Sequence, residues 1–167
     1  RDQVIAGLLN DGKVVGHYSG RTEFGPRALG ARSILASATD QTINQSLNKR
    51  LDRTEFMPFA PVTTDNHAAS CFHGWNPSDL ASRFMAMCYD CTPELAEKCP
   101  AVVHVDGTSR VQMVHQVANP CYHSLLAAFN ELTGVPILLN TSFNLHGFPI
   151  VNEPAEALEA AEQALAV

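Results

Sequence analysis

Apolar residues near the start of the chain recur in short runs separated by turn residues. Two such runs, 4–9 and 13–18, flank Asn10-Asp11-Gly12, whose residues tolerate positive φ. The pattern predicts a β-hairpin over residues 4–18. Further along, proline follows Gly25 directly, and proline is favoured at the first position of a helix. We therefore expect a helix that begins at Pro26.

A second helix is expected from about Asp40, a favourable N-cap residue. Ile43, Leu47 and Leu51 follow at intervals of four and share one helical face. Residues 55–61 contain two prolines, which favour an extended segment at a sheet edge or across the core.

The middle of the chain gives weaker signals. Asp65 is expected to cap a short helix, residues 74–77 to form a loop and residues 83–89 to form a strand. Two further apolar runs, 102–105 and 110–114, surround an Asp-Gly turn and predict a second hairpin.

The last third has the clearest pattern. Asn119 and Pro120 are suited to cap and begin a helix, and Thr133-Gly134 to end it. The apolar face of this helix comprises Tyr122, Leu125, Leu126, Phe129 and Leu132. Next comes a wholly apolar run, 135–139, which predicts a strand buried on both faces. A final helix is expected from Pro154, carrying Leu158 and Leu165.

Length and composition favour one α/β domain over residues 1–167. Hydrophobic residues make up 46% and charged residues 17% of the 167 residues, which excludes a disordered or fibrous chain. No apolar run approaches the ~20 residues of a membrane span. The chain begins with Arg1 and five cysteines lack framework spacing, so we expect a piece of a longer, cytoplasmic protein.

Charge is distributed unevenly along the chain. The net charge is −6, yet residues 1–53 carry +3 and residues 54–167 carry −9. An acidic chain is a poor binder of duplex nucleic acid, because non-specific affinity comes from neutralising phosphates. A local arginine cluster in such a chain suits a small polyanion, although a solvated helical face would look the same.

Two segments have the composition of a binding site. Arg27 lies in the opening turn of the expected helix, where free N–H groups favour an anion, and Arg21 and Arg32 flank it. The alternative is a helix start with Arg27 turned to solvent. In the second segment, 140–144, amide and hydroxyl residues follow a buried strand, where α/β sheets bind ligands. There the alternative is a loop that satisfies its own backbone.

A zinc site is a weaker hypothesis. Cys88, Cys91 and Cys99 with His73 or His104 have suitable chemistry, but structural zinc sites normally need two paired ligand sets. His104 is more simply a core or cross-strand partner.

Four motifs in fixed order resemble the O-carbamoyltransferase family, which includes nodulation-factor, tobramycin, novobiocin and cephamycin carbamoyltransferases. They span about residues 16–160 and read GRTEFGPRALGARSILA (20–36), MPFAP (57–61), HVDGTSRVQ (104–112) and LNTSFN (139–144) with PIV (149–151). The resemblance is to the C-terminal domain of that family. It implies a YrdC-like fold, a twisted mixed β-sheet with flanking helices.

The resemblance also implies a chemistry and partners. In the family this domain takes carbamoyl phosphate and ATP, with magnesium, to a carbamoyl-adenylate. An N-terminal domain with an actin-like ATPase fold then transfers the carbamoyl group to a hydroxyl acceptor. We expect no nucleic acid, membrane or metal ligand set in this segment. The alternative is a non-catalytic module that binds a nucleotide or anion and docks to or regulates the partner domain.

By their positions in the motifs, Arg27, Arg110 and Ser142 are the expected catalytic residues. The further binding candidates are Arg53, Asn140, Arg32 and Thr108. Many family members carry a lysine and an arginine where this chain has Leu51 and Met57. Either Lys49, Arg50 or Arg53 substitutes for those cations, or the chain uses a different activated donor.

Overall fold

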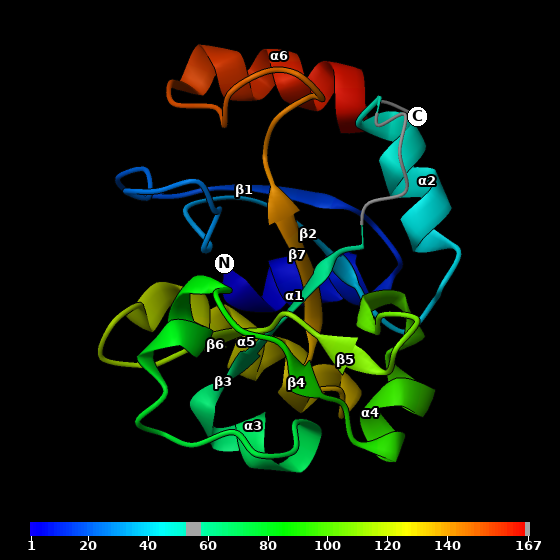
Figure 1. The fold of residues 1–167 in the computed structure, drawn as a ribbon. Coiled ribbons are helices and arrows are strands. Elements are labelled where there is room, and N and C mark those ends of the chain that lie inside the picture. Colours follow the sequence, from blue (N-terminus) through cyan, green and yellow to red (C-terminus); the bar gives the residue numbers. More distant parts are fainter. Residues whose placement is uncertain (53–57, 166–167) are drawn as a thin grey trace.

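A computed structural model describes residues 1–52 and 58–165, with both faces of its main sheet covered by helices (Figure 1). The helices are α1 (Asp2–Asn10), α2 (Ile43–Arg50), α3 (Asp65–Cys71), α4 (Pro93–Lys98), α5 (Pro120–Thr133) and α6 (Pro154–Leu165). Two short 3-10 helices are η1 (Leu80–Phe84) and η2 (Pro100–Val102). The strands are β1 (Val15–Tyr18), β2 (Arg32–Ser37), β3 (Ala60–Thr64), β4 (Tyr89–Asp90), β5 (Thr108–Ser109), β6 (Gln112–Val114) and β7 (Leu138–Ser142).

The main sheet has five strands in the order β1-β2-β7-β3-β6. Only β3 and β6 pair in parallel; the other neighbours are antiparallel. Strands β4 and β5 form a separate two-stranded ribbon. This is a mixed α/β architecture, as predicted.

Alternating side chains of the strands separate the core into two layers. Leu35, Val114 and Leu138 pack with α1 and α5 on one face of the sheet. Their chain neighbours Ile34 and Leu139 pack on the other face, with α2, α6 and the segment that contains α3 and α4. Because successive strand residues point to opposite faces, both layers are built from the same strands.

Helices with local signals form where the sequence predicts them. Helix α5 is capped by the Asn119 side chain, which accepts from the backbone N–H of Tyr122, and it ends at Gly134 with φ 71°. Its predicted apolar face is buried except for Leu132, which is 55% exposed. Helices α2 and α6 also form near their predicted starts. No helix in the described ranges is long and apolar enough to cross a bilayer.

The first predicted hairpin is wrong. Its first arm is helix α1, and only its second arm contains a strand, β1. The buried residues Ala6 and Leu9 follow helical spacing and pack against α5, whereas Val4 and Leu8 of the same apolar run are exposed. Contact with α5, more than 100 residues away, favours the helix.

The helix expected from Pro26 is also absent, and residues 20–31 form an irregular loop before β2. Glu23 Oε1 accepts hydrogen bonds from the backbone N–H groups of Leu29 (2.7 Å) and Ala31 (2.6 Å). These bonds satisfy backbone donors that a helix would satisfy internally, so the loop is stable without helical structure.

Three other expectations need correction. The strand predicted over residues 83–89 is reduced to β4 after η1. The second hairpin is absent, because β6 pairs in parallel with β3 and residues 100–102 form η2. The buried strand expected at 135–139 is shifted to β7. The extended segment expected over residues 55–61 lies partly outside the described residues, and its last two residues begin β3, an interior strand of the sheet.

Gly30 allows the loop to pass close to α5. Its φ is 113°, and a Cβ there would lie 2.3 Å from Tyr122 Cδ1. We expect Gly30→Ala to lower the free energy of unfolding by about 2–4 kcal/mol, through backbone strain and overpacking.

Urea unfolding measures this loss. The matched control is Gly7→Ala in α1, where an added Cβ meets nothing within 4 Å. That change is expected to raise stability by about 0.5–1 kcal/mol, because alanine favours the helix. Equal stabilities for both variants would contradict the packing argument.

Candidate functional site

A cavity of about 430 Å³ lies where five separate segments meet. Its wall is formed by the loop before β2, the start of β3, the end of β7 and the segments around Met85 and His104. The cavity brings together Arg27, Arg110, Ser142 and Asn140, which are far apart in the sequence. Four of the seven residues predicted to form the site therefore line one cavity.

Buried amides hold the Arg27 loop against the sheet. Asn140 Nδ2 donates to the carbonyl of Ala28 at 3.1 Å and to Gln112 Oε1 at 2.8 Å. Gln112 Nε2 donates in turn to the carbonyl of Leu29 at 2.8 Å. Strands β7 and β6 thus fix residues 28 and 29, and Arg27 lies directly before them.

The two cavity arginines have no acidic partner in the part of the chain that the structure describes. Within residues 1–52 and 58–165, no carboxylate lies within ion-pair distance of Arg27 or Arg110. Arg110 Nε is buried and has no hydrogen-bond partner among these residues. Burial, and then the positive charge of Arg27, lower the pKa of Arg110 below its ordinary value. Such a site favours an anion that both guanidiniums contact.

The polar end of β7 supplies neutral groups to the same cavity. Asn140 is 1% exposed, and its bonds to the loop give it a positioning function. Ser142 lies opposite Ser33 in the sheet register. It is half-buried and lines the cavity. A hydroxyl there can donate to a phosphate or carbonyl oxygen.

Thr108 does not line the cavity but contacts a residue that does. Its hydroxyl lies 3.1 Å from His104 Nδ1 and donates to Asp106 Oδ1 at 2.8 Å. His104 itself lines the cavity, together with Cys88 and Met85. His104 is the first residue of the third motif, and this was the sequence signal that it belongs to the site. An isolated histidine is more often a packing residue.

Arg32 occupies a different environment. Its guanidinium is buried under the Tyr18 ring, 3.6 Å from the ring centroid. It donates to the backbone carbonyls of Ser19, Gly20 and Ala31 at 2.9–3.1 Å. These contacts close the base of the loop, and Arg32 is absent from the cavity wall.

Leu51 and Met57 are the positions where this chain lacks the lysine and arginine of many family members. Arg53 and Met57 lie outside the described residues. Leu51 is fully buried in the core, and neither Lys49 nor Arg50 lines the cavity. Leu51 therefore has a packing function in this chain.

All five cysteines are free thiols. Burial, and then the neighbouring Cys71, raise the pKa of Cys99 to about 12, so this thiol stays protonated. In the described ranges no group of three or more His, Cys, Asp or Glu side chains could hold a metal ion.

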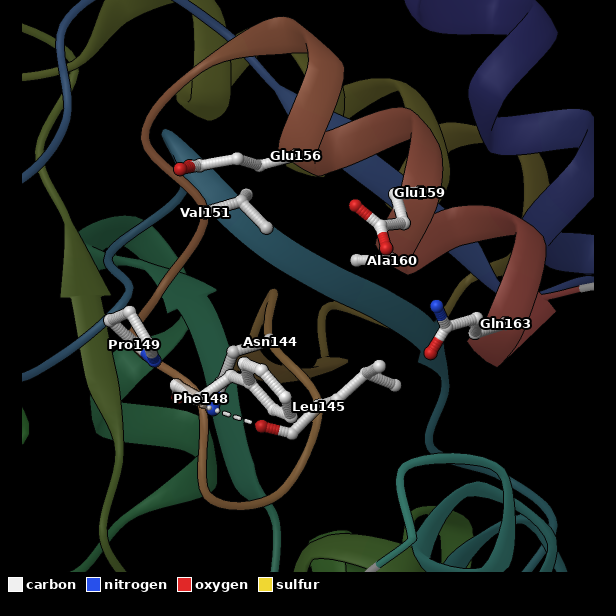
Figure 2. Close-up of a pocket in the computed structure, with 9 residues that line it drawn as sticks. All are labelled: Asn144, Leu145, Phe148, Pro149, Val151, Glu156, Glu159, Ala160 and Gln163. Carbon is white, nitrogen blue, oxygen red and sulfur yellow. Dashed lines mark hydrogen bonds between the residues drawn. The ribbon is translucent and has the colours of Figure 1, made fainter.

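A second, smaller pocket of about 170 Å³ lies between α6 and the loop that follows β7 (Figure 2). Its walls carry Phe148, Leu145 and the carboxylates of Glu156 and Glu159. Glu156 accepts from the backbone N–H groups of Asn152 and Glu153 and so caps α6. No described residue of its lining is a cation, so this pocket is unsuited to an anionic ligand.

The cation pair predicts binding of inorganic phosphate in the larger cavity. Arg110→Gln is expected to weaken phosphate binding at least about tenfold, since charged hydrogen bonds contribute about 1.5–3 kcal/mol each. Isothermal titration at low ionic strength measures the affinity. Arg21→Ala serves as control, because Arg21 is an exposed cation of the same loop that does not line the cavity. Equal losses in both variants would indicate non-specific attraction.

The contacts of Thr108 with Asp106 predict how the Asp106 carboxyl titrates. The Thr108 backbone N–H, and then its hydroxyl, lower the pKa of Asp106. Thr108→Val keeps the backbone bond, so the pKa of Asp106 should rise only part of the way to its ordinary value. Ionised Asp106 stabilises the fold above its unfolded-state pKa, and this contribution is lost as the pH falls through the folded-state pKa.

Carboxyl ¹³C shifts followed against pH test this expectation. The internal reference is Glu94, whose pKa is lowered by Lys98 on the remote helix α4. An unchanged Asp106 titration in Thr108→Val would show that the hydroxyl contact does not form.

The chain matches a known protein family over most of its length. Residues 6–166 match a family described as the carbamoyltransferase C-terminus. Nodulation protein U of Rhizobium tropici is 39% identical over 155 residues, which cover 93% of this chain and 26% of that protein. The chain spans about a quarter of the length of the curated relatives it matches.

Two solved structures share the fold. Full-length HypF, in a phosphate- and nucleotide-bound form, gives a TM-score of 0.70 at 19% identity, covering 99% of this chain and 24% of HypF. A variant of Sua5 from P. abyssi gives 0.61 at 16% identity, covering 95% and 42%. The predicted YrdC-like fold is confirmed.

Proposed function

The chain belongs to the carbamoyltransferase C-terminal family, and from this premise we propose that its cavity activates a carbamoyl donor with ATP. The observation that carries the proposal is the meeting of Arg27 and Arg110 at the Ser142 end of β7, without carboxylate partners in the described residues. The donor would be carbamoyl phosphate, and the product a carbamoyl-adenylate.

The proposed reaction has two steps. Carbamoyl phosphate loses phosphate to water and leaves carbamate. A carbamate oxygen then forms a bond to the α-phosphorus of ATP. The bond between the α-phosphorus and the oxygen that bridges to the β-phosphate breaks, and pyrophosphate leaves. ATP would enter with its Mg²⁺. Negative charge grows on the transferred phosphoryl oxygens, and the two guanidiniums are placed to stabilise it.

Each cavity residue has a proposed function in this scheme. Arg27 and Arg110 hold phosphate oxygens, and the Ser142 hydroxyl donates to the phosphate or carbamoyl group. Asn140 keeps the Arg27 loop on the sheet. HypF, which contains this fold, is described in a phosphate- and nucleotide-bound form, and this supports ligands of that kind.

The acceptor is proposed to bind elsewhere. The relatives are about four times longer than this chain, which leaves room for a domain that receives the carbamoyl group and supplies the hydroxyl acceptor. By family resemblance that partner is an N-terminal domain with an actin-like ATPase fold.

Pyrophosphate release tests the proposal. The full-length protein should release pyrophosphate from ATP only when carbamoyl phosphate is present. Arg27→Ala should lower this rate at least about 100-fold, since one lost transition-state donor costs about that much. Arg21→Ala should leave it unchanged.

The alternative is a non-catalytic module that binds a nucleotide or anion. It predicts ATP binding without pyrophosphate release, with equal affinity in Arg27→Ala and the unchanged protein. That result would refute catalysis.

A further inference from the structure

His104, Thr108 and Asp106 form a chain of side-chain contacts at the edge of the cavity. The His104 ring places Nδ1 3.1 Å from the Thr108 hydroxyl, which donates to Asp106 Oδ1 at 2.8 Å. Backbone bonds hold the same turn, since the N–H of His104 donates to the carbonyl of Thr108 at 2.8 Å. The ring therefore has a fixed orientation.

The donors and acceptors of these three side chains determine which ring nitrogen of His104 carries the proton. Ionised Asp106 can only accept, and its lowered pKa keeps it ionised near neutral pH. The Thr108 hydroxyl gives its single proton to Asp106, so towards His104 it can only accept. Nδ1 must then carry the ring proton. In neutral His104 the Nε2 lone pair is left as an acceptor on a residue that lines the cavity.

The orientation of the Asn140 amide is also determined. Gln112 Nε2 donates to Leu29, so its Oε1 must face Asn140 Nδ2. Reversing the Asn140 amide would place oxygen against the carbonyl of Ala28. Asn140 Oδ1 is buried and has no partner among the described residues.

The cavity thus combines two kinds of group. Arg27 and Arg110 are donors that suit phosphate oxygens, whereas His104 Nε2 is an acceptor that suits an N–H group. A ligand that satisfies both kinds carries a phosphate and, next to it, a primary amide. A ligand without an N–H group would leave the His104 acceptor unsatisfied.

We propose that His104 is the residue that recognises the amide of the carbamoyl donor, accepting an N–H hydrogen bond at Nε2, and that Thr108 is the positioning residue that fixes its tautomer. The inference rests on the proposed function, because it names which donor the cavity prefers. Acetyl phosphate has the same shape as carbamoyl phosphate with a methyl group in place of NH₂. Discrimination between the two measures amide recognition directly.

The experiment titrates the purified protein with fresh carbamoyl phosphate, acetyl phosphate and inorganic phosphate, in the absence of ATP. The unchanged protein should bind carbamoyl phosphate more tightly than acetyl phosphate. His104→Ala should weaken carbamoyl phosphate binding about threefold to tenfold and change acetyl phosphate binding less than about twofold, as expected for one lost hydrogen bond. Thr108→Val should reduce the preference in the same direction.

Two further variants control for folding and for loss of a histidine. His104→Gln keeps an acceptor and should retain part of the preference. His73→Ala removes an exposed histidine outside the cavity and should change nothing. Long-range ¹H–¹⁵N correlation of the imidazole should show the Nδ1–H tautomer in the unchanged protein and a mixture in Thr108→Val.

Three results would overturn the inference: no preference for carbamoyl phosphate in the unchanged protein, equal losses for both acyl phosphates in His104→Ala, or an Nε2–H tautomer. These readouts do not depend on ATP chemistry. A preference that His104→Ala removes, without any pyrophosphate release, would support amide recognition and reject the proposed reaction. Pyrophosphate release with an unchanged preference in His104→Ala would support the reaction and reject the assignment of His104.

Discussion

The buried amides of Asn140 and Gln112 are the constraint on which the site depends. Both side chains are at most 4% exposed, and a buried amide is costly unless its groups find partners. They satisfy much of this requirement by donating to the carbonyls of Ala28 and Leu29. The loop is thereby held on the sheet by the same hydrogen bonds that satisfy the strands' polar side chains, and Arg27 is placed at the end of β7.

The charge at the cavity is opposite in sign to the net charge of the chain. The chain carries −6, yet the cavity brings two guanidiniums together without carboxylate partners in the described ranges. The lowered pKa of Arg110 reflects the cost of this arrangement, from burial and from the like charge of Arg27. A bound polyanion would remove both costs. Uncompensated charge in a folded protein is therefore an argument for ligand binding rather than for stability.

Sequence reasoning succeeded where the signal was local. The cap at Asn119, the proline at 120 and the glycine at 134 act within one turn of α5, and that helix forms as predicted. It failed for residues 2–10 and 26–31, whose structure depends on α5 and on Glu23, Asn140 and Gln112. For the site, the motifs named Arg27, Arg110, Asn140 and Ser142, which share a cavity, but also Arg32, whose guanidinium binds backbone carbonyls instead.

The sequence by itself determined the family, the mixed α/β class and the helices whose caps and apolar spacing lie within a few residues of one another. Only the tertiary structure decided which strands pair, that the Arg27 segment is a loop, and that His104 lines the cavity while it contacts Thr108, which contacts Asp106. The physical reason is the range of the interactions. Caps and helical periodicity act between near neighbours in the chain, whereas parallel pairing and buried amide bonds join segments 28 to more than 100 residues apart.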